Sequence, residues 1–218
     1  MKTSVGIFLV LSTALLFGAH IGATYAGGAG YTPPLTVFTQ ETIGSVFEDD
    51  AGNSIPVSST PPRGSTITTL PGASALFDIA GTWIGLYENT TVTFNKLTPT
   101  RIEIAVPKGR IAVYSHTSNH RRVQISSAKV DALSIDGEMS FVNYDFEQRV
   151  SVIPISGSVG IVVNNNDAQI TQTPVDISEK APFAVTDTKF SLDGNSAKDF
   201  YTWFDDRVKA QTTDGTSG

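Results

Sequence analysis

Two histidines are the residues whose spacing could hold a metal ion. His116 and His120 stand four positions apart, which on a helix would place both imidazoles on one face. The residues between them are polar and lie between strand-like segments, and the chain has no cysteine that could add a ligand. We therefore expect no metal and no cofactor, and a metal site would have to use His116 and His120.

A Ser-x-x-Lys spacing at Ser126 and Lys129 is the one candidate for a nucleophile. A Ser-Lys pair needs both residues on one helical turn and a desolvated lysine, whereas Gln124 to Ser126 reads as a strand. Trp83 and Tyr87 could flank a sugar, but single aromatics in short strands usually belong to a core. Because no carboxylate pair can be assigned a role either, we expect that the protein is not an enzyme.

The elements that would position these residues include a β-like segment that occurs twice. Arg101 to Val113 and Arg149 to Ile161 align at an offset of 48 residues, each with an alternating apolar strand, a Gly and a second apolar strand. This similarity predicts a structural repeat in which Gly109 and Gly157 occupy matching turns.

Short β-like pieces fill residues 35–178. They are rich in β-branched and aromatic residues and are interrupted by turn residues such as Gly64 and Gly72. Strands this short must pair with neighbours to bury an apolar face. The predicted fold is therefore all-β, a stack of short strands that is either β-helix-like or a sandwich, with the repeat inside it.

The C-terminal part carries the helix signal. After a linker at residues 179–195, residues 196–210 read as a helix that Ser196 can cap. Phe200, Trp203 and Phe204 fall on one face of it, and that face must be buried. We expect a C-terminal capping helix on the open β-core, followed by a disordered tail at residues 211–218.

The segment between Pro61 and Thr90 resembles the core of the FecR domain family. The shared elements are Gly64, Ile67-Thr68-Thr69, Gly72-Ala73-Ser74, Leu76 to Asp78, and Leu86 to Thr90, followed by Pro107 to Val113. The resemblance covers about residues 57–163 and extends to Ala197 to Arg207, which is similar to the tail of some exported, stand-alone FecR-domain proteins. It implies a module that contacts proteins and carries no catalytic residues.

Membrane-spanning FecR regulators hold a sigma factor with a cytoplasmic region ahead of their membrane segment. Here only Met1 to Ser4 precede the apolar segment. The resemblance therefore leads us to expect the exported β-module without the sigma-binding region, and no direct control of transcription by that route.

The first 26 residues read as a secretory signal peptide, and residues 27–34 read as a flexible leader. Lys2, an apolar run from Val5 to Phe17 and small residues up to Ala26 fit cleavage after Ala26, and an uncleaved anchor is the alternative. The absence of cysteine fits a bacterial envelope better than a eukaryotic extracellular space. We expect a periplasmic or extracellular protein that does not insert into the membrane once the signal is cleaved.

Charge argues against a nucleic-acid partner. One of the 15 basic residues, Lys2, lies in the signal segment, so 14 basic residues remain against 21 acidic ones. Nucleic-acid binding needs a dense positive surface to neutralise phosphates, and this balance does not provide one.

The favoured function is an exported envelope module that binds an envelope protein or associates with itself. A carbohydrate or cell-wall binding module is the alternative, with a glycan as its ligand, and a secreted hydrolase is the least favoured possibility.

We predict that the mature chain begins at Gly27, because the small residues at Ala23, Thr24 and Ala26 suit signal peptidase. The intact mass of the exported protein tests this. A mass that includes Met1 to Ala26, with extraction only by detergent, would show a membrane anchor instead.

Overall fold

The computed structural model describes residues 38–43, 47–48, 54–55, 64, 66–79, 81–98, 100–115, 121–166 and 168–214. All of them belong to one unit that runs from Pro34 to Gly218. The predicted signal peptide, the leader at residues 27–34, and both His116 and His120 lie outside the described residues.

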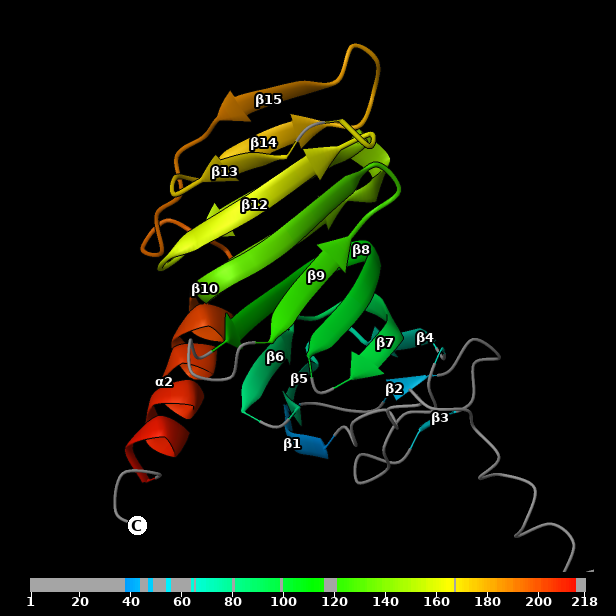
Figure 1. Cartoon of the computed structure of the whole chain (residues 1–218). Coiled ribbons are helices and arrows are strands. Elements are labelled where there is room, and N and C mark those ends of the chain that lie inside the picture. The colour runs from blue at the N-terminus through cyan, green and yellow to red at the C-terminus, as the bar shows by residue number, and fades with distance from the viewer. Residues whose placement is uncertain are drawn as a thin grey trace, which may run out of the picture. The chain divides into compact units, whose positions relative to one another are not determined.

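Within this part of the chain, strands follow one another almost without interruption (Figure 1). They are β1 (Phe38–Ile43), β2 (Phe47–Glu48), β3 (Ser54–Ile55), β4 (Thr66–Thr69), β5 (Ser74–Ile79), β6 (Thr82–Leu86), β7 (Thr91–Thr98), β8 (Arg101–Ser115), β9 (Arg122–Ser126), β10 (Val130–Tyr144), β11 (Arg149–Pro154), β12 (Ser158–Val163), β13 (Gln169–Thr171), β14 (Val175–Ser178) and β15 (Ala184–Asp187). The 3-10 turn η2 (Asp145–Glu147) follows β10, and the helix α2 (Lys198–Asp214) ends the described chain.

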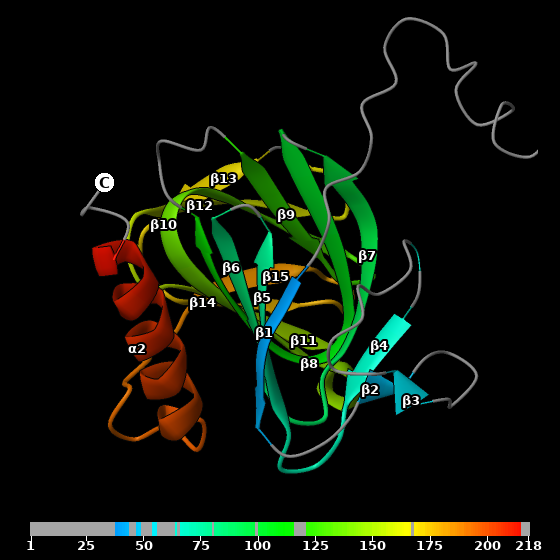
Figure 2. The same cartoon turned by 90° about the horizontal axis from the view of Figure 1, so that it is seen from below.

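The strands form two sheets that share β8 and β10. Sheet A has the order β1-β5-β6-β8-β10-β11-β14-β15. Sheet B has the order β3-β2-β4-β7-β8-β9-β10-β12-β13. Both sheets curl around one apolar core, seen end-on in Figure 2. Phe77 of sheet A meets Phe94 of sheet B edge to face there, with ring centroids 5.5 Å apart.

β8 passes from sheet B to sheet A at Gly109. Ile102, Ile104 and Val106 are buried before this point, and Ile111 and Val113 are buried after it. The inward positions thus change from even to odd numbers, which requires one inserted residue. Gly109 has φ +97°, and a Cβ on it would come within 2.5 Å of the Thr90 Cα, so only glycine fits this corner.

The expected all-β fold with a C-terminal helix is confirmed. Neighbouring strands run antiparallel, and β8 with β9 is the parallel pair among the described strands. Because the coils of a β-helix are built from parallel strands, the sandwich-like alternative describes this molecule.

The predicted repeat does not occupy equivalent positions. Arg101 to Pro107 lies in sheet B and Arg110 to Ser115 in sheet A, whereas β11 lies in sheet A and β12 in sheet B. Gly109 packs against Thr90, while Gly157 (φ +77°) lies between β11 and β12, next to Ser156, which packs against Gly137 in the middle of β10. The alternation of apolar and polar residues indicates only that a strand has one face on a core, so it could not show which sheet each copy joins.

Two predicted boundaries were also wrong. The linker at residues 179–195 contains β15, whose four residues are all exposed and whose sequence therefore shows no alternation of buried and exposed positions. The backbone pairing with β14 holds it in place. Residues 211–214, which were assigned to a disordered tail, continue α2.

The helix packs on the outer face of sheet A and so forms a third layer (Figure 1). We call this packing the outer-face cluster. Leu76, Trp83 and Ala112 of the sheet lie against Ala197, Phe200, Tyr201, Phe204 and Val208, with Trp203 partly buried beside them. The predicted aromatic face is thus buried, but on a sheet face and not over the end of a stack.

Polar contacts fix the helix on the sheet. Asn195, and not the predicted Ser196, supplies the side-chain oxygen at the helix start, since its Oδ1 accepts the Ala197 N–H at 2.9 Å. The Tyr201 and Ser140 hydroxyls lie 2.7 Å apart, and Ser140 donates to the Ile111 carbonyl at 3.1 Å. Both hydroxyls of this buried pair therefore have partners.

Gly85 leaves the space that lets α2 approach sheet A. A Cβ there would stand 2.6 Å from Cδ2 of Phe204 and 3.3 Å from Cζ of Phe200. We predict that Gly85→Ala costs about 1–3 kcal/mol through overpacking, measured by denaturant unfolding. Gly194→Ala is the control, because a Cβ at Gly194 meets nothing within 4 Å. If Phe204→Leu does not recover stability in the Gly85→Ala background, the steric explanation fails.

Glu138 on β10 lies near Asp205 and Lys209 of α2. Burial, and then the negative charge of Asp205, raises the pKa of Glu138 to about 7, against a smaller opposing effect of Lys209. A folded-state pKa above the ordinary 4.5 means that the folded protein binds the proton more tightly than the unfolded chain. The contribution of Glu138 to stability is therefore fully present below pH 4.5 and is lost as the pH rises through about 7.

We predict that Glu138→Gln stabilises the protein more at pH 8 than at pH 4.5, since glutamine stays neutral at both. Thermal unfolding of wild type and variant at the two pH values measures this. Asp206→Asn removes an exposed charge from the same helix and controls for the general effect of one negative charge. An equal change in Tm at both pH values would contradict the prediction.

Candidate functional site

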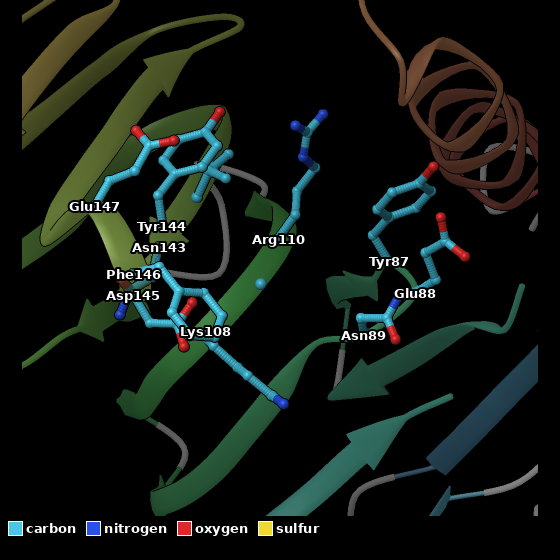
Figure 3. Close-up of a pocket in the computed structure, with 12 residues that line it drawn as sticks. Tyr87, Glu88, Asn89, Lys108, Arg110, Asn143, Tyr144, Asp145, Phe146 and Glu147 are labelled. Atoms are coloured by element: carbon cyan, nitrogen blue, oxygen red, sulfur yellow. The ribbon is translucent and has the colours of Figure 1, made fainter. Parts of the chain in front are cut away.

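A groove lies at the corner where β8 changes sheet, and we call it the corner groove. Its first cavity, of about 360 Å³, has β8 residues 108–110 as its floor and the turn after β6 and the turn η2 as its walls (Figure 3). The lining residues are Tyr87, Glu88, Asn89, Lys108, Gly109, Arg110, Val142, Asn143, Tyr144, Asp145, Phe146 and Glu147.

Two buried threonines hold the wall at Tyr87 to Asn89. Thr90 Oγ1 accepts the Arg110 N–H at 2.9 Å and donates to the Arg110 carbonyl at 3.1 Å. Thr69 Oγ1 accepts the Thr90 N–H at 3.0 Å and donates to the Tyr87 carbonyl. Both side chains are almost fully buried, so this turn is fixed to β4 and β8 before any ligand binds.

Arg110 connects the floor of the groove to the helix layer. Its guanidinium lies 5.7 Å from the Tyr87 ring centroid and 5.5 Å from that of Tyr201, and it donates to Asn195 Oδ1 at 2.8 Å. These cation–π and hydrogen-bond contacts keep the side chain upright between the two walls (Figure 3). Burial, and then the charge of Glu88, raises the pKa of Tyr87 above its ordinary value.

The wall formed by η2 is held by Arg149. This side chain pairs with Glu147 at 2.8 Å and Asp176 at 3.1 Å, and its guanidinium carbon lies 4.0 Å from the Tyr144 ring centroid. Gln148 ends the turn in the left-handed region with φ 50°. The turn is therefore anchored on both sides, although its tip projects from the sheet.

Phe146 at the tip of η2 is 96% exposed, the highest value among the large apolar residues of the described chain. Asn143 behind it is only 6% exposed, and its Nδ2 donates to the carbonyls of Val106 and Pro107 at 2.9 and 2.8 Å. Its Oδ1 has no hydrogen-bond partner among the described residues. The groove thus has an exposed aromatic ring at its rim and, beneath it, a buried acceptor without a partner among the described residues.

A second cavity, of about 580 Å³, continues the groove on the other side of η2, since Asn143 and Asp145 line both. Ser126 and Lys129 lie along it, as do Ser127, Gln148 and Glu179. Ser126 ends β9 and its hydroxyl faces the Ile104 carbonyl at 3.5 Å, so the Ser-x-x-Lys spacing does not lie on one helical turn. Glu179 accepts hydrogen bonds from the Ser127 hydroxyl and, at 3.1 Å, from the Lys129 N–H.

The residues predicted from sequence fall in different places. Gly64, Gly72, Gly109 and Gly157 all have positive φ, and only Gly109 reaches the groove. Trp83 is buried under α2 and cannot flank a sugar, whereas Tyr87 does line the groove. Within the described ranges, no group of three or more potential metal ligands is found.

Sequence analysis missed the residues that form the groove, above all Asn143, Phe146 and Arg110. The signal that could have found Phe146 is its position between Asp145 and Glu147, where a large apolar residue interrupts a polar turn. No pattern in the sequence pairs Asn143 with the carbonyls of β8.

None of the helices in the described part of the chain has the length and apolarity needed to span a membrane. Comparison with protein-family models gave no match, and a search of curated proteins gave none.

Among solved structures, the chain is similar to two crystal structures from Parabacteroides distasonis ATCC 8503, both described as candidate anti-sigma factors. One has a TM-score of 0.49 at 9% identity, over 57% of this chain and 60% of the other. The second has a TM-score of 0.44 at 10% identity, over 73% of this chain and 61% of the other. The chain therefore spans about three fifths of the length of these two structures.

Proposed function

We propose that this protein is a non-enzymatic, exported envelope module of FecR type that binds a protein partner at the corner groove. The observation that carries the proposal is Phe146, which is 96% exposed at the tip of an anchored turn beside a cavity of about 360 Å³. An exposed aromatic residue next to a preformed hollow is typical of the central contact of a protein interface.

The surroundings of Phe146 favour a polypeptide ligand. Tyr87 and Tyr144 offer aromatic surface, and both negatively and positively charged side chains rim the cavity. Such a mixed rim around an aromatic centre is common in protein–protein interfaces. Because both walls are already held by internal bonds, binding orders few further residues of this chain.

A glycan is the second candidate ligand. The specific observation in its favour is that Tyr87, Tyr144 and Phe146 line the same cavity as amide, carboxylate and guanidinium groups. Aromatic rings and polar hydrogen-bonding groups together are what sugar rings require. A glycan would use Tyr87 and Tyr144 as well as Phe146, whereas a protein interface centres on Phe146.

The test is capture from envelope extracts of the source organism by the tagged full-length chain, its Phe146→Ser variant and its Leu192→Ser variant. Leu192 is the matched control, since it is 44% exposed and lies outside the corner groove. We expect one protein to be captured equally by wild type and Leu192→Ser, and about thirtyfold or more weakly by Phe146→Ser, as for the loss of an interface centre worth at least about 2 kcal/mol.

Binding to insoluble cell-wall glycans is measured with the same three proteins. Glycan binding that depends on Phe146, without a captured protein, would favour the carbohydrate alternative over our proposal. Equal capture by wild type and Phe146→Ser would remove the groove from the function. Circular dichroism of each variant checks that the exposed substitutions leave the fold intact.

A further inference from the structure

Arg110 is a half-buried cation that forms no ion pair within the described part of the chain. The partners of its guanidinium there are neutral, namely the Asn195 amide and the rings of Tyr87 and Tyr201. A guanidinium carries five N–H donors in a planar fork, and the Asn195 Oδ1 accepts from Nη1. Other donors of the fork therefore remain for a further acceptor.

The opposite wall of the corner groove contains an arginine whose charge is balanced. Arg149 lies over the ring of Tyr144, as Arg110 lies over a tyrosine ring, but it also pairs with Glu147 at 2.8 Å and with Asp176 at 3.1 Å. Partial burial of a cation costs free energy, which a carboxylate partner offsets. Arg149 has this compensation inside the chain, whereas Arg110 lacks it among the described residues.

The guanidinium of Arg110 is held in place from both ends of the residue. Its backbone N–H and carbonyl both bond to Thr90 Oγ1, at 2.9 and 3.1 Å. The Asn195 Oδ1 that accepts from Nη1 at 2.8 Å also accepts the Ala197 N–H at 2.9 Å, so the start of α2 fixes this contact. The side chain stands between the two walls of the cavity (Figure 3). Binding of a ligand therefore immobilises little of it.

The other charges of the cavity favour an anion on its floor. Lys108 belongs to the floor as well, is exposed, and has no ion pair within the described ranges. Two of the three carboxylates in the lining already have partners, because Glu147 is in an ion pair and Glu88 Oε2 accepts a backbone N–H at 2.6 Å. The third, Asp145, belongs to the η2 wall. The floor thus offers the cations Lys108 and Arg110 to a negatively charged group.

We propose that Arg110 is a carboxylate-binding site in the corner groove and that Asn195 positions its guanidinium. This inference rests on the proposed function, since the carboxylate belongs to the polypeptide that binds there. A guanidinium fork matches the two oxygens of a carboxylate and binds them more strongly than it binds neutral acceptors. An acidic side chain and a chain-terminal carboxylate share this chemistry, and the experiment distinguishes them.

The probes are three N-acetylated amino acids, each titrated into the isotope-labelled full chain. N-acetylglutamate α-amide carries a side-chain carboxylate, N-acetylglycine carries a chain-terminal one, and N-acetylglutamine α-amide is the neutral isostere. The Nε–H signal of Arg110 in heteronuclear NMR spectra reports binding, and its loss in Arg110→Met assigns it. We expect a saturating shift with a carboxylate probe and none with the isostere, and the tighter carboxylate identifies the source. Arg122 is the reference whose signal should not saturate, because it is exposed and lies outside both cavities.

Asn195→Asp is the decisive variant. Aspartate keeps an oxygen that can accept the Ala197 N–H, so the helix start is retained, but it supplies Arg110 with a carboxylate from within the chain. We expect the carboxylate probes to bind this variant about tenfold or more weakly, because the charge-assisted bond is already made. Unchanged binding in Asn195→Asp overturns the proposal, and so does a wild-type shift that never saturates or that the neutral isostere reproduces. Circular dichroism checks that the variant keeps its fold.

The probe titration uses no partner protein, so its failure is distinguishable from failure of the proposed function. If wild type binds no carboxylate probe while protein capture still depends on Phe146, the Arg110 site is wrong and the groove proposal stands. If the probes bind at Arg110 while capture does not depend on Phe146, the site stands and the groove proposal is wrong.

Discussion

The shared strands β8 and β10 are the constraint on which the rest of this structure depends. A strand that serves two sheets around one core turns the corner through a bulge or a bend, and in β8 the inward face slips by one residue. In β8 the slip falls at Lys108 and Gly109, and Thr90 closes against the glycine where a side chain would otherwise stand. The slip leaves Asn143 bonded to carbonyls of β8 at a point where regular pairing stops. The corner groove is thus a direct result of how the chain turns from one sheet to the other.

The part of sheet A formed by β5, β6, β8 and β10 is buried on both faces, and the two faces are packed differently. Its inner face carries large side chains such as Phe77, Ile84 and Phe141, while its outer face presents Gly85, Ala112 and Ser140 to the helix. Small residues let the aromatic rings of α2 come close to the backbone. Burial of each such ring contributes roughly 1.5 to 3 kcal/mol, against a typical total stability of ~5–15 kcal/mol. The helix is therefore an integral layer of the domain.

The sequence predicted those parts of the fold that depend on local pattern. Alternation identified the strands, and the spacing of Phe200, Trp203 and Phe204 identified the helix and its buried face. Pairing between distant segments left no comparable signal. β15 has no buried side chain to mark it, and the similarity of residues 101–113 to 149–161 reflected a shared environment without a shared position. The groove was unpredictable for the same reason, because Asn143, Arg110 and Phe146 come together only through the corner.

The position of α2 in the chain has a consequence for synthesis. The helix is made after every strand, yet its contacts reach far back: Tyr201 meets Ser140 across 61 positions, and Asn195 meets Arg110 across 85. While the chain is being made, Leu76 and Trp83 have no cover on the outer face until α2 follows. A chain that stops short of α2 exposes apolar surface that the complete chain covers with the helix. Chaperones and proteases recognise that property, so they can distinguish finished from unfinished molecules.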